Sequence, residues 1–240
     1  MKLRTVYIII LTVILISFCV IMYSAFSNIA VHTSSDEAAY PKPYIVIDAG
    51  HGGEDGGAQV DGVLEKDINL NISDKLADML RLCGYYVTEV RDDDISVYDR
   101  SSADTLREKK VSDLNKRVQL FNSSADNIVV SIHQNKFDNS AYSGTQIFYS
   151  VNNDKSGLLA EAIRRSVVGL IQSDNTRELK PAGTDIFVLD KAAVPAVIVE
   201  CGFLSNNEER SKLLDENYQS DMAYSIAMGV LEYIETVKQR

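Results

Sequence analysis

The chain has 240 residues, of which 45% are hydrophobic, and a formal net charge of −10 at pH 7. This length leaves room for an N-terminal segment and one domain of roughly 200 residues, which is enough to bury a full hydrophobic core. The acidic balance excludes the basic stripe that proteins use to bind nucleic acid, so we expect no nucleic-acid partner.

The N-terminus begins with a short basic and apolar segment. Lys2 and Arg4 precede an apolar stretch that continues to Phe26. About 20 apolar residues reach the lower limit for crossing a ~30 Å hydrocarbon core, and the basic flank places the N-terminus in the cytoplasm. We interpret residues 1–26 as a signal peptide or membrane anchor and favour an uncleaved anchor, although residues 25–27 fit a cleavage site. In either case the following domain works outside the cytoplasmic membrane.

Strands alternate with helices along the rest of the chain. Residues 27–43 lack periodicity and read as a linker, in which His32 is expected to be solvated. The domain then covers residues 44–240. We expect strands at 44–49, 85–91, 128–132, 144–150, 186–189 and 196–200, and helices at 67–83, 113–122, 157–172 and 217–237. This order predicts a single α/β domain with a mostly parallel sheet and helices on both faces.

The three cysteines do not form a disulfide framework. Cys19 lies in the apolar N-terminal stretch, Cys83 ends an expected helix and Cys201 lies in an expected strand. A Cys83–Cys201 disulfide could form in an oxidising compartment, but we expect two buried free thiols. A nucleophilic role for Cys201 is disfavoured, because side chains alternate along a strand and Cys201 points away from the face of Glu200.

Three of the expected strands end in side chains that can bind metal or transfer protons. Residues 45–58 read IVIDAGHGGEDGGA, a β-branched strand followed by a glycine-rich turn that holds His51. Residues 128–135 read IVVSIHQN and end near His133, and residues 196–202 read AVIVECG and contain Glu200. Ligands collect at the carboxyl ends of parallel strands, so we expect these side chains to meet at one edge of the sheet. The glycine spacing does not match a dinucleotide-binding loop.

Two histidines at strand ends suggest a catalytic zinc site, which needs a third protein ligand and an open position. Glu65 opens the first long helix just past the glycine loop and is close enough in sequence to fold back on His51. A glutamate in a first helical turn also complements the helix dipole without any metal. We predict one zinc ion per chain, held by His51, Glu65 and His133.

Glu200 follows four apolar residues, 196–199, so its carboxylate is expected to be half-buried, with a raised pKa. A glutamate beside a zinc-activated water can accept its proton and later protonate a leaving amine. The alternative is a structural ion pair with a nearby arginine or lysine.

Several blocks in the domain resemble the zinc-dependent N-acetylmuramoyl-L-alanine amidases of the amidase-3 type, which are bacterial cell-wall hydrolases. The matching blocks are Ile47-Asp48-Ala49-Gly50-His51-Gly52-Gly53, residues 62–70, 84–91 and 114–122, Ser131-Ile132-His133-Gln134-Asn135, and residues 195–209. Val90-Arg91 replaces the usual Thr-Arg, and the stretch 92–112 is long and charged. These departures affect the fit of the substrate and leave the metal set intact.

The resemblance implies an open six-stranded sheet, zinc ligands at His51, Glu65 and His133, and a catalytic role for Glu200. It also implies hydrolysis of the amide between N-acetylmuramic acid and L-alanine of the stem peptide. The interval between His133 and Glu200 is too short for the inhibitory helix of some Gram-negative division amidases. An anchored, bare catalytic domain resembles the germination-specific subgroup, which modifies spore cortex toward muramic-δ-lactam during sporulation. A zinc peptidase acting within the stem peptide and an inactive zinc-binding wall scaffold are the alternatives.

The substrate partner implied by the resemblance is peptidoglycan. No wall-binding repeat follows the domain in this sequence, so we expect localisation to come from the N-terminal segment or from a partner. Glycine-rich backbone around His51 is costly to order, so zinc affinity of the domain alone is expected to be modest. A membrane-side protein activator that ordered this loop would raise zinc affinity, and by linkage zinc would tighten its binding.

Overall fold

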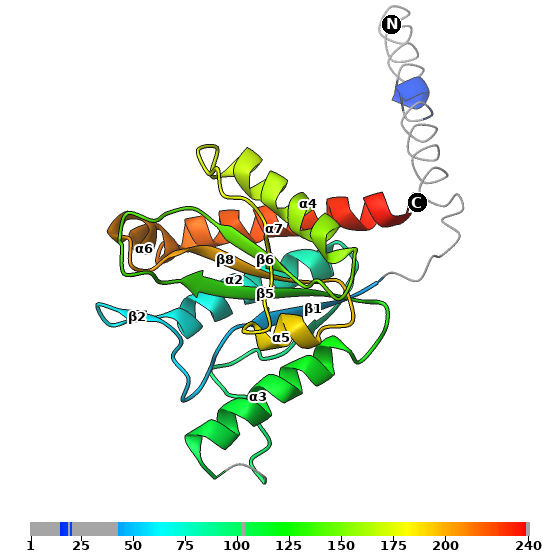
Figure 1. Ribbon diagram of the computed structural model, residues 1–240. Coiled ribbons are helices and arrows are strands. Elements are labelled where there is room, and N and C mark those ends of the chain that lie inside the picture. The colour runs from blue at the N-terminus through cyan, green and yellow to red at the C-terminus, as the bar shows by residue number, and fades with distance from the viewer. Residues whose placement is uncertain (1–14, 19, 21–42, 102–103, 239–240) are drawn as a thin grey trace, which may run out of the picture. The chain divides into compact units, whose positions relative to one another are not determined.

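A sheet of six strands, in the order β4-β1-β5-β8-β6-β7, lies at the centre of the structure (Figure 1). The computed structural model describes residues 15–18, 20, 43–101 and 104–238. The chain divides into two compact units, Met1–Lys42 and Pro43–Arg240, and the sheet belongs to the second. The expected signal or anchor at 1–26 and the linker at 27–43 lie almost wholly outside the described residues. Among those that are described, no helix combines the length and apolar character needed to cross a membrane.

Four neighbouring strands of the sheet are parallel, β6 is antiparallel to β8, and β7 is parallel to β6. In sheet order the strands are β4 (Tyr86–Glu89), β1 (Tyr44–Ala49), β5 (Asn127–Asn135), β8 (Ala196–Phe203), β6 (Gln146–Tyr149) and β7 (Lys180–Pro181). A separate antiparallel hairpin joins β2 (Gln59–Val60) to β3 (Val63–Leu64). The expected α/β domain with an open, mostly parallel, six-stranded sheet is confirmed.

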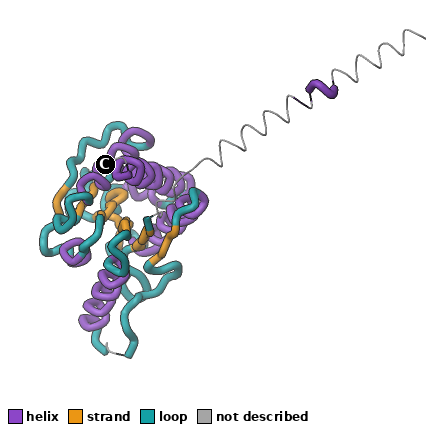
Figure 2. Tube along the Cα trace, turned by 90° about the vertical axis from the view of Figure 1, so that its right-hand side faces the viewer, coloured by secondary structure: helices purple, strands orange, loops and turns teal. Residues whose placement is uncertain are grey.

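Helices cover both faces of the sheet. One face carries α2 (Glu65–Leu82), α4 (Ser156–Leu170) and α7 (Glu216–Lys238), and the other carries α3 (Leu106–Phe121) and α5 (Phe187–Lys191). The short helix α6 (Asn207–Leu213) follows β8. In two perpendicular views the strands lie between α3 and the α4–α7 layer (Figures 1 and 2).

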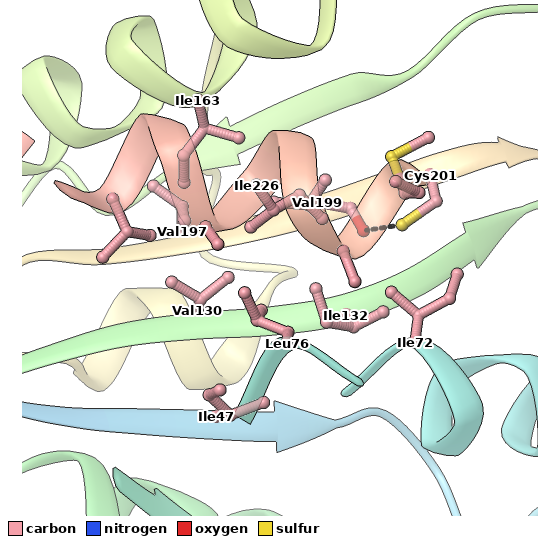
Figure 3. Packing of buried hydrophobic residues seen from close by; sticks show 14 of the residues in the cluster. Ile47, Ile72, Leu76, Val130, Ile132, Ile163, Val197, Val199, Cys201 and Ile226 are labelled. Carbon is pink, nitrogen blue, oxygen red and sulfur yellow. Dashed lines mark hydrogen bonds between the residues drawn. The ribbon is translucent and has the colours of Figure 1, made fainter. Parts of the chain in front are cut away.

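Alternation along the central strands divides the core between the two faces. Ile45 and Ile47 of β1 pack in the cluster of α2, α4 and α7, whereas Val46 packs in the cluster of α3 and α5. The close view of the first cluster shows Ile47, Val130 and Val197 in neighbouring strands (Figure 3). Because both faces are covered, these strands read as nearly continuous apolar runs.

Helix α3 begins seven residues earlier than the expected helix at 113–122. A capping box starts it: the Thr105 hydroxyl accepts a hydrogen bond from the Glu108 N–H at 3.2 Å, and the Glu108 carboxylate accepts one from the Thr105 N–H at 2.9 Å. These bonds satisfy donors that a helix N-terminus otherwise leaves unpaired. The charged stretch 92–112 is therefore partly helical.

The expected strand at 186–189 is wrong, because these residues lead into and form helix α5. The N–H groups of Leu189 and Asp190 donate to the Ile186 carbonyl at 3.0 and 2.9 Å. A run of four apolar residues is too short for periodicity to separate a strand from a helical turn. Val188 and Leu189 are buried in the α3-side cluster.

The expectation of two buried thiols is half right. No disulfide joins Cys83 and Cys201, but Cys83 is exposed at the end of α2. Cys201 is buried beside Val199 in the α2-side cluster, away from the face that carries Glu200 (Figure 3). Burial raises the pKa of the Cys201 thiol, so it stays protonated and has no nucleophilic character.

Candidate metal centre and catalytic carboxylate

The loop that carries His51 leaves β1 through a sharp turn. His51 has φ +62°, a left-handed conformation that is uncommon outside glycine, and Gly52 follows with φ +133°. Two backbone hydrogen bonds close the turn, from the Gly52 N–H to the Asp55 carbonyl at 2.9 Å and from the Asp55 N–H to the Gly52 carbonyl at 3.1 Å. The backbone position of His51 is thus set by the turn around it.

Two buried arginines bind the carbonyl oxygens of this segment. The Arg91 guanidinium donates to the carbonyls of Ala49 and Gly50 at 2.9 and 3.0 Å. The Arg117 guanidinium donates to the carbonyls of Ala49 and His51 at 3.0 and 2.7 Å. The end of β1 is therefore anchored from the segment just after β4 and from α3, which come from distant parts of the sequence.

Asp48 lies beneath the loop and neutralises Arg117. Its carboxylate forms an ion pair with the Arg117 guanidinium and accepts a hydrogen bond from the Ser131 hydroxyl at 2.7 Å. Burial alone would raise the pKa of Asp48, but the guanidinium and the hydroxyl outweigh burial and lower it. Asp48 is thus a charged structural residue, and both of its carboxylate oxygens have partners within the protein.

His51, Glu65 and His133, the three predicted ligands, lie close together at the carboxyl edge of the sheet. The Oε2 atom of Glu65 lies 3.2 Å from His51 Nε2, and its Oε1 atom lies 2.9 Å from His133 Nδ1. The three donor atoms all lie within 4.8 Å of one another. Three separate elements supply them: the loop after β1, the first residue of α2 and the strand β5.

Two glycines make room for this cluster. A Cβ atom on Gly50 would lie 2.3 Å from the His133 ring, and one on Gly57 would lie 2.5 Å from Glu65 Oε2 and 2.6 Å from His51 Cδ2. Gly57 also has φ +69°, whereas the requirement at Gly50 is purely one of space. The glycine-rich sequence therefore lets the backbone approach the candidate ligands closely.

The donor set and its surroundings fit a zinc ion. Two imidazoles and one carboxylate are a known catalytic zinc set, and ligating carboxylates are themselves hydrogen-bonded. Glu65 is buried and accepts hydrogen bonds from the N–H groups of Ala58 and Gln134 at 2.7 and 3.0 Å. Burial opposes protonation of His51, but its hydrogen bonds to Asp55 and Glu65 raise the pKa to about 9. The negative potential that favours a proton here also favours a divalent cation.

Glu200 lies on β8 directly beside His133 in the sheet register. Its Oε2 atom is shut off from solvent and accepts no hydrogen bond within the described part of the chain. Burial raises the pKa of Glu200 to about 7, and the charge of Glu65 adds to the effect, while His133 and His51 act against it. No arginine or lysine among the described residues forms an ion pair with it, which argues against the structural alternative.

A cleft of about 510 Å³ opens over His51, His133 and Glu200. This volume is typical of a small-molecule site. Its walls come from residues 96 and 98, from α3 and from α5 with the residues just before it, and they include Tyr98, Leu106, Lys109, Leu114, Ile186, Phe187 and Val188. The cleft is therefore bounded by α3, which begins earlier than expected, and by α5, which replaces an expected strand.

Residues 45–232 match the family described as N-acetylmuramoyl-L-alanine amidase (Amidase_3). The chain belongs to this family. It is similar to the germination-specific N-acetylmuramoyl-L-alanine amidase of Bacillus subtilis (strain 168), with 32% identity over 193 residues that cover 79% of this chain and 78% of that protein. The chain is thus an N-acetylmuramoyl-L-alanine amidase, an enzyme of peptidoglycan, as its motifs indicated.

Solved structures agree with this assignment. The CwlD amidase from Clostridioides difficile, in complex with the GerS lipoprotein, is 38% identical with a TM-score of 0.77, over 81% of this chain and 100% of that one. An N-acetylmuramoyl-L-alanine amidase from Clostridium difficile 630 is 29% identical with a TM-score of 0.69, over 81% of this chain and 98% of that one.

The supporting residues of the site were not recognised from the sequence. Asp48, Asp55, Arg91 and Arg117 lie in the motif stretches, but the sequence assigns them no role. A signal is present for the arginines, since Arg91 ends an expected strand and Arg117 lies at helical spacing from Leu114 and Phe121. The sequence does not show which backbone carbonyls these arginines bind.

We expect Gly50→Ala to lower zinc affinity at least about tenfold, because the new methyl group must displace the His133 ring. The matched control is Gly169→Ala in α4, where nothing lies within 4 Å of the added Cβ, and it should leave zinc affinity unchanged. Competition with a chelator of known affinity measures both. Equal affinity of Gly50→Ala and the unaltered protein would contradict the packing role of Gly50.

Proposed function

We propose that this amidase is zinc-dependent, that His51, Glu65 and His133 hold the zinc ion, and that Glu200 is the general base and acid of the reaction. The bond cleaved is the amide between the lactyl carbonyl of N-acetylmuramic acid and the nitrogen of L-alanine. One observation carries the proposal: beside a cluster of two histidines and a carboxylate lies a second carboxylate, Glu200, with an unpartnered buried oxygen.

The three candidate ligands leave one side of the cluster facing the cleft, which His51 and His133 both line. Zinc at this position would polarise the amide carbonyl and lower the pKa of a bound water toward ~7. The protein supports this chemistry by fixing Glu65 with backbone hydrogen bonds and by packing the His133 ring against Gly50.

Glu200 moves the proton. Its ionised carboxylate takes a proton from the attacking water, and the protonated acid then gives that proton to the alanine nitrogen as the C–N bond breaks. The products are a lactyl carboxylate and a stem peptide with a free amino group. A pKa raised to about 7 makes both forms of Glu200 accessible near neutral pH, which suits a group that must accept and donate in one cycle.

The relatives support a role in the spore cortex. One is a germination-specific amidase, and the solved CwlD structure is 38% identical. We place the action of this chain outside the cytoplasmic membrane, on cortex peptidoglycan, as a step toward muramic-δ-lactam during sporulation. The N-terminal segment at 1–26 would export or anchor it.

The loss of a single histidine ligand should abolish zinc binding. We expect His51→Ala and His133→Ala to be isolated without zinc, whereas His32→Ala, which alters the third histidine of the chain, should contain as much zinc as the unaltered protein. Elemental analysis measures the zinc content. Zinc at a hundredfold excess over its Kd should also stabilise the unaltered protein by about 2.7 kcal/mol and the two ligand variants not at all. Full zinc in either ligand variant would refute the assignment.

Glu200→Gln should separate chemistry from metal binding. The amide keeps the shape of the side chain but cannot accept the proton, so we expect normal zinc content and a loss of roughly 10²–10⁴-fold in kcat. Glu208→Gln, at an exposed position in α6, is the control for a general effect of lost charge. Near-normal turnover of Glu200→Gln would exclude the general-base role, and loss of zinc would make Glu200 a ligand.

Digestion of purified peptidoglycan tests which bond is cut and which form of peptidoglycan is the substrate. Mass spectrometry of digested peptidoglycan should show free lactyl carboxylate on N-acetylmuramic acid together with intact stem peptides. Cleavage within the stem peptide would instead indicate a peptidase. Cortex peptidoglycan should be digested faster than peptidoglycan of the vegetative type, and the reverse order would contradict the cortex role.

A protein partner is expected to regulate zinc occupancy. The CwlD structure contains a lipoprotein, and the His51 loop of this chain is rich in glycine. We expect the isolated chain to contain less than one zinc per molecule, and a membrane-side protein that orders the loop to restore full occupancy and activity. Full occupancy and full activity of the isolated chain in trace zinc would remove the need for a partner.

A further inference from the structure

We propose that Asp55 is a positioning residue for the candidate metal centre: its carboxylate accepts a hydrogen bond from Nδ1 of His51 and so directs Nε2 of the same ring to the zinc ion. This inference rests on the proposed zinc site. Asp55 Oδ2 lies 3.0 Å from His51 Nδ1, and Glu65 Oε2 lies 3.2 Å from His51 Nε2. The two ring nitrogens thus face two different carboxylates.

The chemistry of imidazole gives these two contacts different roles. A neutral ring carries one N–H and one lone pair, and a metal ligand must present the lone pair. Since Nε2 faces Glu65, the second predicted ligand, the hydrogen must lie on Nδ1, where it needs an acceptor. Ligating histidines commonly donate their other N–H to a carboxylate, which sets the tautomer and the ring orientation. Asp55 is placed to serve as this acceptor.

Asp55 is itself held firmly in the loop. Its backbone exchanges two hydrogen bonds with Gly52, and its Oδ1 atom accepts one from the Gly57 N–H at 3.1 Å. The Lys110 ammonium lies 3.6 Å from Oδ2. The two carboxylate oxygens therefore serve different partners, since Oδ1 closes the glycine turn and Oδ2 faces the ring of His51.

The two histidines of the cluster are oriented by different means. The His133 ring is packed against the backbone at Gly50, where no Cβ could fit. Within the described residues, no carboxylate contacts the His133 ring apart from Glu65. His51 lies on a loop with left-handed backbone, and its ring lies against Gly57, but its Nδ1 atom also faces a carboxylate of its own, Asp55 Oδ2, at 3.0 Å.

Glu54 provides a matched control. It is the neighbouring acid in the same loop, its carboxylate pairs with Lys109 at 3.0 Å, and its side chain is 58% exposed. Glu54→Gln removes the same charge one residue away without touching His51. Any effect that comes from net charge near the site should appear in both Asp55→Asn and Glu54→Gln.

The test measures zinc affinity of the full-length protein by chelator competition, after the metal has been removed. It compares the unaltered chain with Asp55→Asn, Asp55→Ala and Glu54→Gln. An asparagine keeps the shape, but only one of its two terminal atoms can accept a hydrogen bond, so it cannot serve Gly57 and His51 together. We expect Asp55→Asn and Asp55→Ala to weaken zinc binding by about 10–100-fold. Glu54→Gln should remain near the affinity of the unaltered protein.

A second readout separates positioning from a general structural role. The chain has three histidines, so nitrogen NMR can assign the ring of His51 in the zinc-loaded protein. We expect Nδ1 to carry the proton in the unaltered chain and a mixed or reversed tautomer in Asp55→Asn. Thermal unfolding of the metal-free proteins should show similar Tm values. A large fall in the metal-free Tm of Asp55→Asn with an unchanged tautomer would overturn the inference and leave Asp55 a loop residue.

The outcomes for this inference and for the proposed function are distinct. Equal zinc affinity of Asp55→Asn and the unaltered protein overturns the positioning role alone. An unaltered protein that binds no zinc overturns the zinc mechanism and the positioning role with it.

Discussion

The site depends on one interaction: two buried guanidinium groups bind three successive backbone carbonyls, those of residues 49–51. Arg91 reaches them from the end of β4 and Arg117 from α3. A buried carbonyl without a partner costs free energy comparable to a lost hydrogen bond, and Asn69 Nδ2 also donates to the Gly50 carbonyl, at 3.1 Å. Asp48 neutralises Arg117 from below, so the buried charge is paired as well as hydrogen-bonded. The anchor lets His51 keep a left-handed conformation beside the cluster.

The two glutamates of the site show how surroundings separate the roles of identical side chains. Glu65 accepts hydrogen bonds from two backbone N–H groups and also faces both histidines, and the two histidines outweigh burial and lower its pKa. Glu200 has an oxygen without such partners in the described chain, and burial raises its pKa to about 7. A carboxylate kept ionised suits a cation, and one that changes its protonation near neutral pH suits proton transfer.

The strands and the helices around the site contribute to it in different ways. The strands β1, β5 and β8 are buried on both faces and hold His133 and Glu200 in register. The cleft above them is walled by α3 and α5, which pack on one face of the sheet and carry side chains of varied type. The sheet edge thus fixes His133 and Glu200, whereas α3 and α5 set the shape of the cleft above them.

The sequence by itself determined the sheet, the glycine loop, the candidate ligands and Glu200, because strand patterning and strand-end chemistry are local and parallel strands end at one edge. It did not determine that residues 186–189 form a helix, since four apolar residues carry no distinguishing period. Tertiary structure alone decided that Arg117 binds the carbonyl of His51, 66 positions away, and that the His133 ring packs against the backbone at Gly50. Such contacts depend on where the packed elements place side chains and backbone carbonyls, and local sequence carries no record of that placement.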